Sequence, residues 1–332
     1  MKKKSFGLII FPTEQCNLRC VYCYQDFNDT ELTEEHYDLL YKEINRKIED
    51  ENKEIISISW FGGEPLLKAD DIIKFNSRIK KLTCEKNIEF YTSMTTNGVL
   101  LDIDLLEKLC NCGVYRFQIT LDGFLHDSQR VFPNGDGSFD KIFKNIMNML
   151  ESNLDFQLML RINIPDKNFD FLFYNLFKKY ADDKRLQILI RAVAQLSEEK
   201  IDLPLLERGI SEKNILNQHE VYLKSLGYNL FDEEDGLFSD VCYASKKDNF
   251  TIRADGKIGK CTVLLDKEFN DIGSINLKNM ILEINKHKND LWSESLLSLK
   301  CKNCKKIMKC FNRSCPAVKI KNQNCDICCN MV

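Results

Sequence analysis

The chain has 332 residues, of which 44% are hydrophobic, and its formal net charge is −3. So small a charge gives no argument for nucleic-acid binding, and no segment approaches the ~20 apolar residues of a membrane span. The opening MKKKSFGLIIFP has too short an apolar run for a signal peptide and lacks a small-residue cleavage site. We therefore expect a cytoplasmic protein of about two domains, with no nucleic-acid or membrane partner.

Apolar or β-branched runs alternate with helical patterns through the first two-thirds of the chain. Strands are predicted at 6–12, 55–61, 88–94, 114–120, 156–163 and 186–193. Helices are predicted at 33–49, 70–82, 102–111, 138–151 and 168–180, several with N-cap residues such as Thr33, Asp102 and Ser138. Six such units are too few for an eight-stranded barrel. We expect an α/β fold, a partial (β/α)6 TIM-type barrel with its site at the C-terminal ends of the strands.

Three of the fifteen cysteines lie close together after the first predicted strand. Cys16, Cys20 and Cys23 have the spacing C-x3-C-x2-C. In a reducing compartment, clustered thiols more often mark metal binding or catalysis than disulfides. Three thiolates are too few for a tetrahedral zinc site. They would suit a [4Fe–4S] cluster with one iron open to an exogenous ligand.

The segment CNLRCVYC, with aromatic Tyr22 before the last cysteine, resembles the radical S-adenosylmethionine (radical SAM) superfamily. The resemblance implies that Cys16, Cys20 and Cys23 hold the catalytic [4Fe–4S] cluster. The free iron would bind the amino and carboxylate groups of SAM. Reduction would then cleave SAM to methionine and a 5′-deoxyadenosyl radical.

Further segments at successive strand ends resemble the same family: FGGEP (61–65), TTNG (95–98), ITLDG (119–123) and RIN (161–163). Two adjacent glycines let a backbone approach a ligand closely, and a guanidinium suits a carboxylate. The alternatives are an ordinary strand-to-helix turn at FGGEP and a solvated surface charge at Arg130. The cofactor-binding residues that the resemblance implies are Tyr22, Gly62, Gly63, Glu64, Thr120, Arg130 and Asn163.

Beyond a predicted helical bridge (211–230) and a hairpin around Asp255-Gly256, the chain is rich in cysteine. The patterns C-x13-G-x4-C (242–261) and C-x2-C-x5-C-x4-C (301–315) resemble the SPASM extension of radical SAM enzymes, which usually holds two auxiliary [4Fe–4S] clusters. Four residues, where the family has three, separate the last two cysteines of the second pattern. The resulting domains are 1–195, the radical SAM core; 196–241, the helical bridge; and 242–332, a small cysteine-rich α+β SPASM domain.

The resemblance also divides the auxiliary ligands. Cys301, Cys304, Cys310 and Cys328 would bind one cluster, and Cys242, Cys261 and Cys315 the other. Cys325 and Cys329 are alternatives for the tail ligand, and one iron could stay open. Zinc is a rival, because Cys301-x2-Cys304 and Cys325-x2-Cys328 have zinc-ribbon spacing. Eight Lys or Arg and no acidic residue at 300–321 favour an anionic cluster.

The resemblance implies a radical SAM oxidoreductase that matures a ribosomally made peptide (RiPP maturation), forming a crosslink such as a thioether or carbon–carbon bond. Its partners would be a peptide or protein substrate and a reductant such as flavodoxin or ferredoxin. Because the first strand begins near residue 6, no N-terminal leader-binding domain is expected. Leader recognition would fall to the barrel mouth, the bridge or a separate protein.

Two other functions remain open. The first is an anaerobic sulfatase maturase, which makes formylglycine. Those relatives carry an aspartate that acts as a base directly after the second SPASM cysteine. Here Thr262 follows Cys261, and Asp266 is the nearby candidate for such a base. The second is an iron–sulfur electron carrier or scaffold without SAM chemistry. The intact cysteine and GGE segments argue against it. His126 is interpreted as structural.

Overall fold

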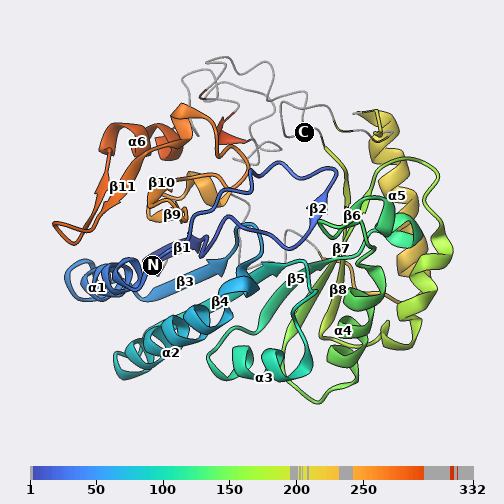
Figure 1. Cartoon of the computed structure of the whole chain (residues 1–332), viewed down its shortest axis with the longest axis horizontal. Coiled ribbons are helices and arrows are strands. Elements are labelled where there is room, and N and C mark those ends of the chain that lie inside the picture. Colours follow the sequence, from blue (N-terminus) through green and yellow to red (C-terminus); the bar gives the residue numbers. More distant parts are fainter. Residues whose placement is uncertain are drawn as a thin grey trace.

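A ten-stranded sheet organises the chain, in the strand order β12-β11-β10-β9-β1-β3-β4-β5-β7-β8 (Figure 1). The structure is a computed structural model that describes residues 3–194, 209–231 and 242–294, with residues 201, 203, 205–207, 315–317 and 320. Of the helices in these ranges, none combines the length and the apolarity that a membrane span requires.

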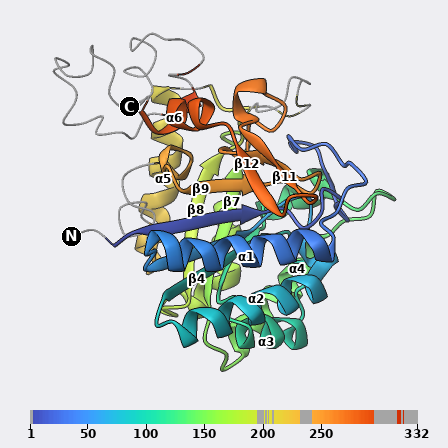
Figure 2. The same cartoon turned by 90° about the vertical axis from the view of Figure 1, so that its left-hand side faces the viewer.

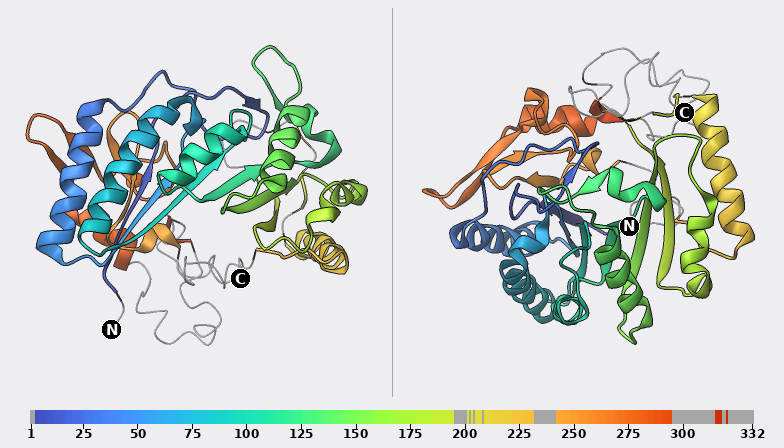
Figure 3. Two further views of the ribbon diagram at one scale, coloured as in Figure 1. Left: turned by 90° about the horizontal axis from the view of Figure 1, so that it is seen from below. Right: turned by 45° about the vertical axis from the view of Figure 1, so that its right-hand side comes forward.

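All six strands predicted for the first two-thirds of the chain are confirmed. Each pairs in parallel with its neighbour in the order β1-β3-β4-β5-β7-β8. Within the described residues β8 is an edge of the sheet, so the strands form a partial barrel rather than a closed one (Figure 3). The bounds are β1 Ser5–Ile10, β3 Ile55–Trp60, β4 Glu89–Thr96, β5 Arg116–Thr120, β7 Gln157–Ile164 and β8 Leu186–Ala192.

Four amphipathic helices cover the outer face of the curved sheet (Figure 1). They connect the strands as the alternation predicted, and their apolar residues pack on the outward-facing strand residues in one core. Asp102 caps its helix as predicted, accepting a 2.9 Å hydrogen bond from the Leu105 N–H. The bounds are α1 Glu34–Glu51, α2 Ala69–Glu85, α3 Ile103–Asn111 and α4 Phe139–Glu151.

Ser138 precedes α4, but its side chain does not cap the helix. Its hydroxyl instead donates to the Arg130 carbonyl oxygen at 2.7 Å. The Asp127 carboxylate accepts hydrogen bonds from the Ser138 and Phe139 N–H groups, both at 2.8 Å. The cap of α4 therefore comes from a residue eleven positions upstream, which a local N-cap pattern does not reveal.

The helix predicted at 168–180 is a 3₁₀ segment, η3 Phe171–Tyr180, rather than an α-helix. Asp170 caps its start by accepting from the Leu172 N–H at 2.8 Å. Aromatic packing dominates the segment: the ring of Phe171 stacks on His219 of α5 (Ile210–Ser225) at 4.4 Å. Helix α5 is the predicted bridge, and it lies beside β8 (Figure 1).

The C-terminal strands extend the same sheet on its other side. β9 (Asn249–Ile252) and β10 (Lys257–Gly259) form the hairpin predicted around Asp255-Gly256. β9 also pairs in parallel with β1, as Figure 2 shows, and β11 (Gly273–Asn276) and β12 (Ile281–Ile284) continue the sheet to its edge. Helix α6 (Lys286–Glu294) follows.

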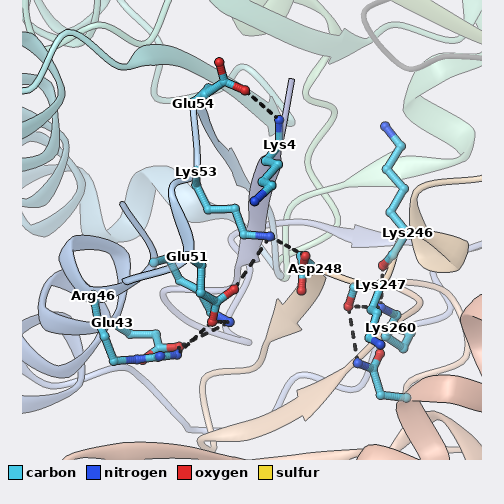
Figure 4. A network of polar contacts seen from close by, with 12 residues as sticks. Lys4, Glu43, Arg46, Glu51, Lys53, Glu54, Lys246, Lys247, Asp248 and Lys260 are labelled. Carbon is cyan, nitrogen blue, oxygen red and sulfur yellow. Dashed lines mark hydrogen bonds and ion pairs between the residues drawn. The ribbon is translucent and has the colours of Figure 1, made fainter. Parts of the chain in front are cut away.

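The junction between β9 and the barrel is reinforced by charge. Lys53, two residues before β3, forms an ion pair with Asp248, which precedes β9, and a second with Glu51 at 3.7 Å (Figure 4). The Lys53 side chain is 7% exposed and that of Asp248 is 33% exposed, so the pair is partly shielded from water. The chain between residues 242 and 261 is thereby held against the barrel.

Candidate functional site

The three N-terminal cysteines lie in the loop between β1 and α1, at the C-terminal ends of the parallel strands. They line a cavity of about 200 Å³ with residues from every strand end around it. This is the edge at which a partial barrel is expected to carry its site. The predicted site residues at the cavity wall are Cys16, Cys20, Tyr22, Cys23, Gly62, Gly63, Thr120, Arg130 and Asn163.

The glycine pair of FGGEP fits against the cysteine loop. The Gly63 N–H donates to the Thr13 carbonyl oxygen at 3.2 Å, and the Glu64 N–H donates to that of Gln15 at 2.8 Å. A Cβ at Gly62, where φ is +117°, would lie 2.5 Å from the Thr13 carbonyl oxygen. A Cβ at Gly63 would lie 2.2 Å from that of Gln15. Glycine is therefore needed here for close approach to the backbone that carries Cys16.

Glu64 occupies a different place from the other predicted contacts. Its side chain is fully buried and lies outside the set of cavity-lining residues. The carboxylate accepts hydrogen bonds from Thr96 Oγ1 at 2.7 Å, the Asn97 N–H at 2.7 Å and the Leu66 N–H at 2.9 Å. Burial raises its pKa, and these donors oppose that effect. Glu64 joins the GGE segment to the TNG segment, and direct contact with a ligand stays a prediction.

Hydrogen bonds of the Tyr22 side chain hold the cysteine loop in place. Its phenol bonds the Asp122 carboxylate and accepts hydrogen bonds from Arg130 Nη1 at 3.0 Å and Asn163 Nδ2 at 3.2 Å. Asp122 also accepts from the Asn163 N–H at 2.9 Å. Three predicted residues therefore meet in one buried polar network, and their shared partner Asp122 belongs to the ITLDG segment.

Arg130 is held beside the cysteines by backbone pairing. Its strand β6 (Arg130–Val131) pairs antiparallel with β2 (Arg19–Cys20), so that Arg130 stands opposite Cys20. The side chain is 7% exposed, and its Nε has no hydrogen-bond partner among the described residues. The surface-charge alternative for Arg130 is wrong. A buried guanidinium at the cavity wall can receive an anionic group.

The three thiols are chemically suited to binding a metal cluster. Burial raises the pKa of Cys16 to about 12, and it raises the pKa values of Cys20 and Cys23. Arg130 opposes the shift at Cys20. Buried thiolates need a cation as partner, and a cluster supplies one at each iron. The residues therefore fit a [4Fe–4S] group bound by Cys16, Cys20 and Cys23.

Several residues that line the cavity are not among the site residues predicted from the sequence. Asn97 Nδ2 donates to Asn17 Oδ1 at 2.7 Å, which ties the TNG segment to the cysteine loop. Arg161 Nε donates to Asn163 Oδ1 at 2.8 Å. Asn97 belongs to the TTNG segment and Arg161 to the RIN segment, so these motifs indicate both residues as site candidates. Tyr24, Gln25 and Gln118 also line the cavity, and no pattern marked them.

His126 is structural, as interpreted from the sequence. It is fully buried: its Nδ1 accepts from the Asp122 N–H at 3.1 Å, and its Nε2 lies 3.0 Å from Ser138 Oγ. Burial lowers its pKa to about 3, so the imidazole is neutral and fixes the turn below Asp122.

Three of the predicted auxiliary ligands fall within the described residues. Cys242 and Cys261 are partly buried, and Cys315 is exposed. Burial raises the pKa values of Cys242 and Cys261, and the nearby Cys315 thiol adds to both shifts. The other predicted ligands, and with them the zinc-ribbon alternative, lie outside the described residues: Cys301, Cys304, Cys310, Cys325, Cys328 and Cys329.

No three His, Cys, Asp or Glu side chains in the described ranges are close enough to share one metal ion. This finding concerns sites that hold a single metal ion. The thiolates of a four-iron cube bind separate iron atoms and need not converge on one point.

Comparison with known proteins agrees with this geometry. Residues 10–171 match the family model described as the Radical SAM superfamily. The cysteine-type anaerobic sulfatase-maturating enzyme of Clostridium novyi is 26% identical over 91% of this chain and 85% of its own length. A GTP 3′,8-cyclase of Clostridium botulinum is 33% identical over 52% of this chain, and this chain spans about half of that protein (53%).

Two solved structures share the fold. The sulfatase maturase anSMEcpe with bound AdoMet and the Kp18Cys peptide has a TM-score of 0.64 at 20% identity, covering 91% of this chain and 87% of its own. Streptococcus suis SuiB bound to the precursor peptide SuiA has a TM-score of 0.52 at 15% identity, covering 93% and 70%. From the family match together with the cysteine loop, residues 10–171 of this chain are a radical SAM domain.

Proposed function

We propose that the chain is a radical SAM maturase that modifies a residue of a ribosomally made peptide and forms a crosslink within it. The observation that carries this proposal is the cavity at the strand ends, which is lined by three partly buried thiols of one loop and by Arg130. Structural neighbours that bind peptides support the substrate class.

The residues of the chain would share the work as follows. Cys16, Cys20 and Cys23 hold the cluster, and Arg130 receives the carboxylate of SAM in the charge-assisted manner of a guanidinium. When bound, the cluster and SAM would supply a 5′-deoxyadenosyl radical that takes one hydrogen from the substrate. The Tyr22 network keeps the loop in place, and the cavity excludes competing hydrogen donors.

A crosslink removes two hydrogen atoms from the peptide. One leaves with the deoxyadenosyl group, and the other leaves as a proton together with one electron. That electron needs an acceptor in the protein. We assign this task to the auxiliary clusters, one of them bound by Cys242, Cys261 and Cys315. The Cys315 thiol raises the pKa values of both Cys242 and Cys261, which supports the grouping of these three thiols. The basic character of residues 300–321 supports clusters over zinc.

Formylglycine formation is the second candidate, favoured by the relative from Clostridium novyi. Its chemistry calls for a base beside the substrate. Thr262, at the position after Cys261, has its hydroxyl 2.7 Å from the Tyr243 hydroxyl and cannot serve as one. Asp266 lies outside the cavity-lining sets, with a side chain 58% exposed and paired with Lys267 at 2.6 Å. These placements support the crosslinking proposal.

Mass spectrometry of candidate peptides tests the function. Short reading frames beside the gene supply the candidates, incubated anaerobically with reconstituted protein, SAM and a reductant such as flavodoxin. A product that is lighter by two hydrogen atoms, fragments as a ring and does not react with hydrazide supports crosslinking. A hydrazide-reactive aldehyde at a former cysteine or serine would identify formylglycine formation instead. Absence of SAM cleavage would favour an electron carrier or scaffold.

A further inference from the structure

Arg19 lies within the cysteine motif, on the face of its strand that points away from the cavity. It forms β2 together with Cys20, and β2 pairs with β6 at the ends of the barrel strands (Figure 1). Successive side chains of a strand point to opposite faces. Cys20 lines the cavity, and Arg19 is not among the described residues that do. Arg19 is therefore placed to act on a group bound in the cavity only through the cysteine loop.

The Arg19 guanidinium is fixed to the backbone of this loop. Its Nη1 donates to the Cys16 carbonyl oxygen at 2.7 Å and to the Leu18 carbonyl oxygen at 2.9 Å. Its Cζ lies 4.1 Å from the centre of the Phe27 ring, which is within the range of a cation–π contact. These contacts hold the guanidinium directly beside the backbone of the first cluster ligand.

The positive charge of Arg19 has no counter-charge in the described part of the chain. Its partners there are two carbonyl oxygens and an aromatic ring, and no carboxylate forms an ion pair with it. The side chain is partly buried, so water screens its charge less than it would at an open surface. Because an arginine does not lose its proton within a protein, this charge is permanent.

The field of Arg19 reaches the thiols of the loop. Burial raises the pKa of Cys23, whereas a backbone hydrogen bond from Gln25 and the guanidinium groups of Arg130 and Arg19 lower it. Arg130 acts from the cavity wall, and Arg19 acts from the other face of β2. A cation that favours a thiolate also favours added negative charge on the metal group that the thiolate binds.

A [4Fe–4S] group at these thiols becomes more negative when it takes up an electron. Its reduction potential depends on the net charge around it, on hydrogen bonds to its sulfur atoms and on its exposure. A fixed cation nearby stabilises the reduced form more than the oxidised form and so raises the potential. Arg19 supplies such a cation without occupying space in the cavity.

We propose that Arg19 is a positioning residue that raises the reduction potential of the cluster through its charge, from the side of the loop opposite the cavity. The step concerned is the uptake of one electron from an external low-potential donor. No bond breaks in it, and Arg19 neither gains nor loses a proton. The inference rests on the proposed function only in that Cys16, Cys20 and Cys23 hold a cluster, and it is independent of the peptide.

A potentiometric titration followed by electron paramagnetic resonance tests this role without SAM or peptide. The signal that is missing from the Cys16/Cys20/Cys23→Ala variant belongs to this cluster. In Arg19→Met the ratio of reduced to oxidised cluster at a fixed potential should fall about tenfold, which corresponds to a midpoint lower by about 59 mV for one electron.

Arg78→Met is the matched control for the loss of one positive charge. Arg78 belongs to α2, where it pairs with Asp38 at 2.7 Å and lies over the Tyr41 ring at 4.7 Å. Its contacts therefore resemble those of Arg19 in kind, but none of them involves the cysteine loop. Arg78→Met should leave the midpoint at the wild-type value. A midpoint lowered equally in both variants would overturn the proposal.

Two further variants separate the charge of Arg19 from its hydrogen bonds. Arg19→Lys keeps the charge, and Arg19→Gln keeps an N–H donor for the carbonyl oxygens without the charge. We expect a midpoint near the wild type for the lysine variant and a midpoint like that of Arg19→Met for the glutamine variant. The reverse order would assign the effect to hydrogen bonding and overturn the proposal.

The failure of this inference differs from the failure of the proposed function. Because a midpoint reports the ratio of reduced to oxidised cluster, it can be compared between variants that bind different amounts of iron. Wild-type midpoints in all Arg19 variants, with or without loss of iron, would make Arg19 a structural support of the loop and reject its redox role alone. Identical signals from the wild type and the Cys16/Cys20/Cys23→Ala variant would reject the cluster, and with it both proposals.

Discussion

Arg253, at the end of β9, forms a buried ion pair with Glu14, which directly precedes the cysteine loop: Arg253 Nη2 and Nε lie 2.7 Å and 2.8 Å from Glu14 Oε1. Glu14 Oε2 accepts a further hydrogen bond from Asn28 Nδ2 at 2.8 Å. Residues 239 positions apart thus join the C-terminal sheet extension to the loop that holds Cys16. The C-terminal region therefore braces the cysteine loop as well as carrying its own cysteines.

We predict that Arg253→Met lowers the free energy of unfolding by about 3 kcal/mol, because it leaves a buried carboxylate unpaired. The iron bound per chain should also fall, since the cysteine loop loses its support. Chemical denaturation and iron analysis of the purified variant measure both effects.

Lys81→Met is the control for that variant, because its pair with Glu85 is largely exposed. An exposed pair contributes about 0–1 kcal/mol. Equal losses for the two variants would mean that the Arg253–Glu14 pair does not brace the loop.

Gly62→Ala should reduce iron content as well as SAM affinity. The added Cβ meets the Thr13 carbonyl oxygen at 2.5 Å, so the cysteine loop must move, and the positive φ adds strain. Gly135→Ala is the matched control: its φ is +89°, but no atom lies within 4 Å of the added Cβ. Iron content at the wild-type level in Gly62→Ala would show that the loop tolerates the displacement.

The positions of the motifs and of the six parallel strands could be predicted from the sequence, because each motif ends a strand and strand ends meet at one edge of a parallel sheet. The role of Gly62 could not, since its neighbour Thr13 is distant in sequence. The same holds for Asp127 as the cap of α4 and for the pairing of β9 with β1.

Changing Cys315 to Ala should remove about four irons per chain while SAM cleavage without substrate persists. The reason is its expected grouping with Cys242 and Cys261, apart from the cysteines of the SAM site. Cys84, an exposed thiol of α2, provides the control, and Cys84→Ala should leave the iron content unchanged. Retention of all iron and full peptide-modifying activity in the Cys315 variant would reject the assignment.

His126 should make stability depend on pH. Its pKa is lowered to about 3 in the folded protein, so the unfolded chain binds one more proton as the pH falls below 6.5. The stability present near pH 7 is therefore lost by about 1.4 kcal/mol per pH unit as the pH falls from 6.5 toward 3.

Replacing His126 by Asn removes this contribution to the pH dependence of stability. The stability difference between wild type and His126→Asn should shrink by about 1 kcal/mol between pH 7 and pH 5.5, as measured by urea denaturation. A difference that stays constant over this range would show that His126 becomes protonated without penalty in the folded state.

The central claim is that Cys16, Cys20 and Cys23 hold a cluster that cleaves SAM reductively. Its most direct test is the release of 5′-deoxyadenosine by anaerobically reconstituted protein supplied with SAM and dithionite, measured by chromatography beside a Cys16/Cys20/Cys23→Ala variant. We predict steady release by the wild type, about four fewer irons in the variant, and no release from it. Release at equal rates from both proteins, or from neither, would contradict the account.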